Sequence, residues 1–408
     1  MHSLLKNLRI VEGASFIAAP SCGLHLLQMG AEVIRFDDMR RSPDRGRWPV
    51  AANGHSLYWE GLNKGKKSIA LDLSRPEGRE IAVNLITAPG EGAGLFLTNY
   101  PTDGFLSHDR LVKLRPDLIT LRVMGWSDGR TAVDYTVNPA LGVPAMTGPA
   151  SLGETPVNHV LPAWDLLAGA YAAAALLAAE RYRRDTGAGQ EVRVPLADVA
   201  TTALGNLGQV AEVLVTGRDR PRMGNDLFGA LGRDFLTQDQ RRIMIVAITS
   251  RQWSSLISAL NIQPDVSRIE TELSVSFADE GVRFTHREPL FNVIATAVAA
   301  RTFADLATSF DSAGVCWGPY RTLSQAVAEG ALNETPGLFN NVSHPSGYNY
   351  PTPGSAASFS AINRESATRA PRLGEHTEEI LSNILGLNTP QIGRLLSEKV
   401  VQAAVPVV

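Results

Sequence analysis

An aspartate stands at the start of the longest apolar stretch of the sequence, where a carboxylate could act as a nucleophile. Asp165 directly precedes residues 166–184, which are rich in Ala, Leu, Glu and Arg, lack proline and end in basic residues. These features predict a buried helix over 166–184. An aspartate in front of a helix is most often an N-cap, whose carboxylate accepts backbone N–H groups of the first turn. The same N–H groups would favour the ionised carboxylate, which could attack a carbonyl carbon and form a covalent intermediate.

A second group of residues could bind an anion. Lys64, Lys66 and Lys67 flank Gly65 in the segment GLNKGKKSIALDL, just before a predicted strand. Glycine lets the backbone approach a phosphate, and ammonium groups supply positive charge. Taken alone, such a pattern is more often a solvated turn than an anion site, and both interpretations stay open. Further arginines precede this segment, at Arg40, Arg41, Arg45 and Arg47.

These groups must be positioned by a sheet, and the sequence predicts a parallel one. Predicted strands cover residues 8–12, 32–36, 94–100, 118–123 and 191–196, with a helix over 21–28. A strand, a helix and a second strand joined by short connections form a βαβ unit, whose strands are parallel. Polar residues at strand ends, such as Asn99, lie where open α/β sheets bind ligands. No G-x-G-x-x-G run follows the first strand, so a dinucleotide fingerprint is absent from the sequence.

Composition excludes several classes of function. The chain has 408 residues, of which 44% are hydrophobic and 19% charged, which is ordinary for a globular protein. Its net charge of −3 supplies no general field for nucleic acid or an anionic membrane. The two cysteines fit neither a disulfide framework nor a metal site. The longest apolar run is shorter than the roughly 20 residues that cross a bilayer, and we see no secretion signal, so we expect a cytoplasmic protein.

Several segments together resemble the family III CoA-transferases of the CaiB/BaiF type, over nearly the whole chain. They are the aspartate that opens the apolar helix and the segments FIAAP, MGAEVIRFD, GLNKGKKSIALDL, DTGAGQEVRVPLAD and PRLGEHTEEIL. The resemblance implies that Asp165 is the catalytic nucleophile and that the substrate is an acyl-CoA. Coenzyme A then enters as part of the substrate, and no separate cofactor or metal is expected.

The resemblance also implies where the substrate lies. The backbone near Ile17 and Ala18 would meet the thioester end of CoA, and Lys66, with Asn63 and Lys64 beside it, would contact the phosphates. Further substrate contacts are implied at Asn99, Tyr100, Asp134, Tyr135 and Asn138. The family often has an arginine where this chain has Asp38, so we expect the adenine-side contact from Arg40 or Arg41 instead.

The fold class that the resemblance implies is α/β, with a Rossmann-like large domain built on a parallel sheet and a smaller α/β domain. Residues 1–216 would form the N-terminal part of the large domain, with the CoA site and the nucleophile. Residues 217–320 would form a connector and the small domain, and residues 321–408 a return segment that completes the large domain. Two subunits would interlock as a homodimer.

Several reactions are compatible with such a site. The segments GRWPV, HSLYWEGLNKGKKSIALDL and RPRMGNDLFGALGRDF resemble an isomerase branch of the family, which moves CoA between two carboxyl groups of one acyl unit. Transfer to a separate carboxylic acid, and CoA binding without catalysis, are the alternatives. Racemisation is disfavoured, because the places of its acid and base hold Val133 and Thr249, which cannot move a proton near neutral pH. His376 could be a base, but a structural histidine at a helix start is the commoner case.

Overall fold

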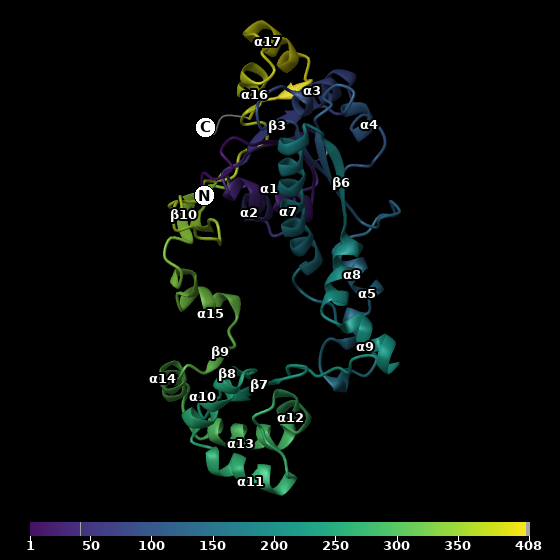
Figure 1. Cartoon of the computed structure of the whole chain (residues 1–408). Helices are drawn as coiled ribbons and strands as arrows, with labels where there is room; N and C mark the ends of the chain where they lie inside the picture. The colour runs from purple at the N-terminus through teal and green to yellow at the C-terminus, as the bar shows by residue number, and fades with distance from the viewer. Residues whose placement is uncertain (41, 405–408) are drawn as a thin grey trace. The chain divides into compact units, whose positions relative to one another are not determined.

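The computed structural model describes residues 1–40 and 42–404, which divide into two compact units (Figure 1). The large unit comprises Met1–Leu141, His159–Val210 and the chain from Leu332 onward. The small unit comprises Gly142–Asn158 and Ala211–Ala331. Residues 142–158 thus belong to the small unit, whereas the sequence-based division places them within 1–216. The backbone N–H of Gly224 donates to the Gly148 carbonyl at 3.0 Å, which ties this segment to the small unit.

The large unit is built on a seven-stranded sheet in the order β12-β3-β2-β1-β4-β5-β6. All neighbours are parallel except β12, which is antiparallel to β3. The central order 3-2-1-4-5-6 is that of a doubly wound Rossmann sheet, which confirms the predicted fold class. The strands are β1 (Arg9–Gly13), β2 (Glu32–Asp38), β3 (Lys67–Leu71), β4 (Leu95–Thr98), β5 (Ile119–Met124), β6 (Gln190–Pro195) and β12 (Val401–Gln402).

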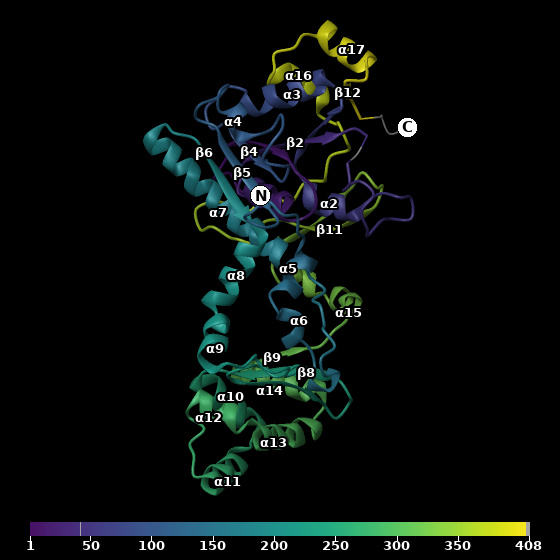
Figure 2. The same cartoon turned by 90° about the vertical axis from the view of Figure 1, so that its right-hand side faces the viewer.

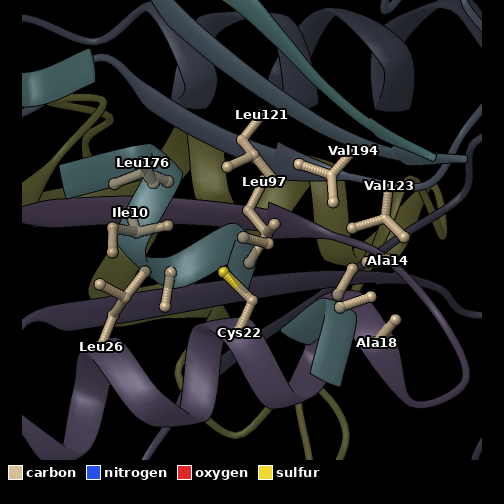
Figure 3. Close-up of a cluster of buried hydrophobic side chains, with 14 of the residues drawn as sticks. Ile10, Ala14, Ala18, Cys22, Leu26, Leu97, Leu121, Val123, Leu176 and Val194 are labelled. Atoms are coloured by element: carbon tan, nitrogen blue, oxygen red, sulfur yellow. The ribbon is translucent and has the colours of Figure 1, made fainter. Parts of the chain in front are cut away.

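Helices cover both faces of this sheet, because successive strand residues point to opposite sides. Ile10 packs beneath α1 (Ala18–Gln28) and α7 (Ala163–Thr186), while its neighbour Val11 packs with α3 (Pro76–Thr87), α16 (Thr377–Asn383) and α17 (Thr389–Ser397). Figure 3 shows Cys22 and Leu26 of α1 facing the strand residues of the first cluster. The shorter helices are α2 (Leu57–Asn63), α4 (His108–Leu111), α5 (Asp134–Ala140) and α8 (Leu196–Asn206).

Helix α7 is long and apolar enough to cross a membrane by length and composition alone. It packs against α1, β5 and β6, and Figure 2 shows it lying along these two strands. Contact with α1 is close at Gly169, where an added Cβ would lie 1.9 Å from Ser21 Oγ and 2.8 Å from the Ala18 carbonyl oxygen. The apolar surface of α7 is therefore explained in part by packing inside the large unit, as in core helices of globular proteins.

The small unit has its own core around a three-stranded antiparallel sheet. This core is built from alternate strand residues and from the apolar faces of the helices that follow them. The elements are α6 (Val143–Met146), α9 (Gln209–Thr216), β7 (Leu231–Leu236), β8 (Arg242–Ala247), α10 (Ser250–Leu260), α11 (Gln263–Leu273), α12 (Glu280–Thr285), α13 (Arg287–Ala299), α14 (Phe303–Ala313), β9 (Cys316–Pro319) and α15 (Leu323–Ala328). The chain then returns to the large unit through the hairpin β10 (Phe339–Ser343) and β11 (Asn349–Pro353).

Candidate active site

The prediction that Asp165 directly precedes the helix, as its N-cap, is wrong. Helix α7 begins at Ala163, with Pro162 in the cap position, so Asp165 lies within the first turn. Proline has no side-chain acceptor, and no side chain in the cap position satisfies the N–H groups of this turn. The cap comes instead from another part of the chain.

That cap is the side chain of Asp134, the first residue of α5. Its Oδ2 accepts hydrogen bonds from the backbone N–H groups of Trp164, at 2.7 Å, and Asp165, at 3.3 Å. Its Oδ1 lies 2.5 Å from Nε2 of His159, and the Asp134 side chain is fully buried. Both oxygens of Asp134 are thus used within the chain, at the start of α7 and at His159, which corrects the expectation that this residue contacts the substrate. Sequence reasoning missed this role because 30 residues separate the cap from the helix that it serves.

The Asp165 carboxylate is left without local partners. Within residues 1–40 and 42–404 it makes no hydrogen bond or ion pair. Burial and, to a smaller extent, the charge of Asp134 raise the pKa of Asp165 to about 6, while the charge of Arg47 opposes this rise. Near neutral pH the carboxylate is thus ionised but poorly solvated, and a desolvated anion is a stronger nucleophile than a hydrated one.

A cationic side chain lies near this carboxylate. The guanidinium of Arg47 stacks over the rings of Phe16, at 5.2 Å, and Tyr58, at 4.9 Å, measured to the ring centroids. Phe16 has a left-handed backbone conformation, with φ of 70°, and its N–H donates to Asp44 Oδ1 at 3.0 Å. Arg47 belongs to the basic region seen in the sequence, but no feature of that region distinguishes it from its neighbours. Phe16 and Tyr58 were not predicted.

The loop after β1 brings Ile17 and Ala18 to the start of α1. Ile17 occupies the N-cap position of that helix and Ala18 is its first residue, and both are buried. Asn99 holds this loop: its Oδ1 accepts from the Ser15 N–H at 3.2 Å, and its Nδ2 donates to the Ser15 carbonyl at 2.9 Å. The predicted residues Ile17, Ala18 and Asn99 are thus brought together at the ends of β1 and β4.

Lys66 and Asn63 lie inside the large unit. The Lys66 ammonium donates to both Glu12 carboxylate oxygens and to the Pro20 carbonyl, each at 2.9 Å, and to Asn63 Oδ1 at 3.1 Å. Lys66 is 2% exposed and Asn63 1% exposed. An ammonium has three N–H bonds, and all are used here. The expectation that Lys66 and Asn63 meet the CoA phosphates is therefore corrected by their burial: they hold β1, α1 and α2 together.

Arg35 extends this network of buried charges. It donates to Asp37 at 2.8 and 2.9 Å and to Asp44 Oδ2 at 2.9 Å, and its side chain is fully buried. Since Asp44 also accepts the Phe16 N–H, the network reaches from the sheet to the turn beside Arg47. Unpaired burial of such charges would be costly, so the network fixes one geometry of the loops.

The remaining residues that were expected to contact the substrate do not belong to this network of buried charges. Lys64 is buried beside Lys66, and burial, with the charge of Lys66 second, lowers the pKa of Lys64 to about 8. Tyr100 stacks on Phe36 at 6.3 Å, and burial raises its pKa to about 12. Arg40 pairs with Asp72 at 2.7 Å, and Arg41 lies outside the described residues.

Tyr135 and Asn138 contact the segment before α7. Tyr135 donates its hydroxyl to the Val160 carbonyl at 3.0 Å, and Asn138 Oδ1 accepts from the Trp164 indole at 3.0 Å. Both residues support the position of Asp165. His376 Nδ1 accepts the Ser68 N–H at 3.1 Å, which supports the structural interpretation of this histidine. Among the described residues, no group of three or more His, Cys, Asp or Glu side chains could hold a metal ion.

The arrangement suits acyl transfer through a covalent intermediate. It offers one poorly solvated carboxylate at the start of a helix, backbone N–H groups at the start of α1 that no side chain in the cap position accepts, and a cation stacked on aromatic rings. A carboxylate nucleophile that is not hydrogen-bonded in place can approach a thioester carbonyl without first losing partners.

Comparison with known proteins gives consistent results. The family model described as CoA-transferase family III matches residues 5–377. The 2-methylfumaryl-CoA isomerase of Chloroflexus aurantiacus is 47% identical over 403 residues, covering 98% of each chain. The succinyl-CoA–L-malate CoA-transferase beta subunit of the same organism is 28% identical over 97% of this chain and 98% of that protein. A CAIB/BAIF family protein from Brucella suis has the same fold, with a TM-score of 0.75, 24% identity and coverage of 94% of this chain and 100% of that one.

Proposed function

Since this chain belongs to CoA-transferase family III, we propose that it converts 2-methylfumaryl-CoA, the C1 thioester of mesaconate, into 3-methylfumaryl-CoA, the C4 thioester. The observation that carries this proposal is the 47% identity, over 98% of both chains, to a 2-methylfumaryl-CoA isomerase. Relatives that use succinyl-CoA are more distant, at 28% identity or less. The reaction would be an intramolecular CoA transfer, and we include a role in the 3-hydroxypropionate cycle of carbon fixation in this proposal.

The mechanism starts with attack of the Asp165 carboxylate on the C1 thioester carbonyl. The C–S bond breaks, giving a mixed anhydride of Asp165 and mesaconate with free CoA thiolate. The thiolate then attacks the Asp165 carbonyl of the anhydride, which forms an aspartyl-CoA thioester and releases mesaconate within the site. The C4 carboxylate attacks this thioester, whose C–S bond breaks, giving a second anhydride and CoA thiolate again. The thiolate then attacks the C4 carbonyl, the bond between this carbonyl carbon and the Asp165 oxygen breaks, and the Asp165 carboxylate is restored. Covalent catalysis thus divides one difficult exchange into four acyl transfers.

The surrounding residues would support these steps. Asp134 occupies the N–H groups at the start of α7, so the Asp165 carboxylate keeps its negative charge unpaired and reactive. The backbone of Ile17 and Ala18 would contact the thioester end of CoA, where an N–H could stabilise the developing oxyanion. Lys64, Tyr100 and Tyr135 remain proposed substrate contacts. CoA is bound as part of the substrate, without a separate cofactor.

We further propose that the chain works as an interlocked homodimer in the cytoplasm. Several apolar side chains of α7 are exposed in the single chain, including Leu166, Leu167 and Tyr171. Burial of such residues against a second copy would stabilise a symmetric interface. Light scattering at micromolar protein concentration should give a dimer, and a folded, active monomer would contradict this part of the proposal.

The test of the reaction is incubation of the purified protein with 2-methylfumaryl-CoA and no added acid. Separation of the C1 and C4 thioesters with mass-spectrometric detection should show isomerisation. Isotopically labelled free mesaconate, added to a parallel sample, should not enter the product. Strict dependence on an added carboxylic acid would instead identify an intermolecular CoA-transferase. Turnover that is unchanged in Asp165→Asn would contradict a covalent role for this residue.

A further inference from the structure

Among the residues that the structure describes, Arg47 has no anionic partner. Within residues 1–40 and 42–404 its guanidinium makes no ion pair and no side-chain hydrogen bond. It is half-buried, and its stacking on Phe16 and Tyr58 occupies the face of the guanidinium. Stacking of this kind leaves the N–H edge available, and that edge suits bidentate binding of a carboxylate.

The position of Arg47 is fixed from several directions. Its carbonyl accepts the Ser56 hydroxyl at 2.6 Å, and its N–H donates to the Asp44 carbonyl at 3.4 Å. Asp44 also holds the strained turn at Phe16, and Asp44 is itself held by buried Arg35. A left-handed phenylalanine costs free energy, so it persists only where its surroundings impose it. The stacked arginine is therefore presented by a rigid frame.

Tyr58 supplies a second unpaired group beside Arg47. Its hydroxyl oxygen is buried and has no hydrogen-bond partner among the described residues. Burial raises the pKa of Tyr58, and the charges of Asp44 and Asp165 add to this effect although that of Arg47 opposes it, so the hydroxyl keeps its proton. An unpaired buried donor is costly, and a ligand that accepts its hydrogen bond recovers that cost.

Each of these two groups is coupled to the charge of the same carboxylate, that of Asp165. The charge of Arg47 lowers the pKa of Asp165, and the charge of Asp165 contributes to the raised pKa of Tyr58. Neither residue makes a hydrogen bond with Asp165 itself. The arginine and the hydroxyl thus lie within the electrostatic range of the candidate nucleophile, and neither is paired with it.

We propose that Arg47 and Tyr58 bind the carboxylate of the substrate that is not joined to CoA, and so select monothioesters of dicarboxylic acids. This inference rests on the proposed function and names the residues that hold the acceptor group. During the reaction, mesaconate is free while CoA is attached to Asp165, and both of its carboxylates are charged. Asp165 is neutral at that stage, so the positive charge of Arg47 is directed to mesaconate and retains it. The two carboxylates of mesaconate then change places: the C1 carboxylate moves to Arg47 and the C4 carboxylate moves to Asp165. Attack by the C4 carboxylate gives the C4 product.

The experiment compares 2-methylfumaryl-CoA with the CoA thioester of 2-methylbut-2-enoate, in which a methyl group replaces the free carboxylate. For the first substrate, kcat and KM of isomerisation are measured. For the second, the rate of covalent CoA attachment to Asp165 is measured by mass spectrometry. Arg47→Gln should raise KM for 2-methylfumaryl-CoA about tenfold or more and release free mesaconate. It should change CoA attachment from the uncharged analogue less than about threefold.

Tyr58→Phe keeps the ring that stacks on Arg47 and removes only the hydroxyl. It should lower kcat/KM for 2-methylfumaryl-CoA severalfold while leaving the uncharged analogue unaffected, and it tests the inference even if Arg47→Gln fails to fold. Arg45→Gln is the matched control, because it removes an exposed arginine from the same loop, and it should behave like the wild type. Equal losses with both substrates, or no loss with 2-methylfumaryl-CoA, would overturn the inference. A wild-type protein that does not isomerise 2-methylfumaryl-CoA would instead refute the proposed function.

Discussion

Replacing Asp165 by asparagine should abolish turnover and, at the same time, stabilise the folded protein. The pKa of Asp165 is raised from 3.8 to about 6, chiefly by burial. A difference of about two pKa units corresponds to about 3 kcal/mol, which is the upper limit of the cost of keeping this carboxylate ionised in the folded state. Asparagine has a similar shape and no charge, so it avoids this cost.

The sign of the pH dependence follows from the raised pKa. Below the unfolded pKa, Asp165 is protonated in both states, and its ionisation costs the folded protein nothing. As pH rises from there through the folded value near 6, the unfolded state ionises more readily than the folded state, so the wild type loses stability. The free energy of unfolding of Asp165→Asn should therefore exceed that of the wild type by up to about 3 kcal/mol at pH 8. About 1.4 kcal/mol of this difference should appear between pH 5 and pH 8.

Urea unfolding followed by circular dichroism, at pH 5, 6, 7 and 8, measures this difference on the same preparation used for kinetics. A stability difference that does not grow with pH would refute the claim that Asp165 is held in a costly ionised state. Retention of more than about a tenth of wild-type turnover, only ~1.4 kcal/mol in the barrier, would refute its role as nucleophile. Hydroxylamine provides a further check, since it should modify Asp165 only in the presence of acyl-CoA.

Three further changes test the frame around the nucleophile. Asp134→Asn keeps a capping oxygen but removes a charge that raises the pKa of Asp165, so the acid limb of the kcat/KM profile should move to lower pH by up to about one unit; an unchanged limb would contradict this coupling. Gly169→Ala should lower the free energy of unfolding by about 1–3 kcal/mol, because the new Cβ meets Ser21 and the backbone of α1; this loss should exceed the gain from the better helix propensity of alanine. Denaturant titrations should show that Ser21→Ala in the same chain restores part of the loss. Lys66→Met leaves buried Glu12 without its closest partner and should cost about 3 kcal/mol by the same measurement, whereas a neutral effect would show that the pair is dispensable.

The sequence predicted the sheet and the helix of Asp165 because both depend on local periodicity. Runs of apolar residues at strand spacing and a long alanine-rich stretch are visible without knowledge of contacts. The start of α7 was misplaced because its cap is Asp134, and a cap supplied across 30 residues leaves no mark near the helix. Lys66 was placed at the CoA phosphates by the family resemblance, and the local sequence, in which lysines flank a glycine, shows no partner that would bury it. Its partner, Glu12, lies on another strand, and this pairing appears only in the folded chain.

The buried charges around Arg35 should make the geometry of the site insensitive to ionic strength. Salt screens charges that contact water, with a Debye length of about 10 Å at 0.1 M, but it has little effect on pairs from which solvent is excluded. Solvent is excluded from the ion pairs of Arg35 with Glu12 and Asp44, so salt should affect them little. Arg40 is 60% exposed, so salt should screen its charge. Adding salt should therefore leave the geometry of the turn at Phe16 intact while it weakens the adenine-side contact that we expect from Arg40. Salt titration thus offers a way to separate capture of the nucleotide end of the substrate from events at its acyl end.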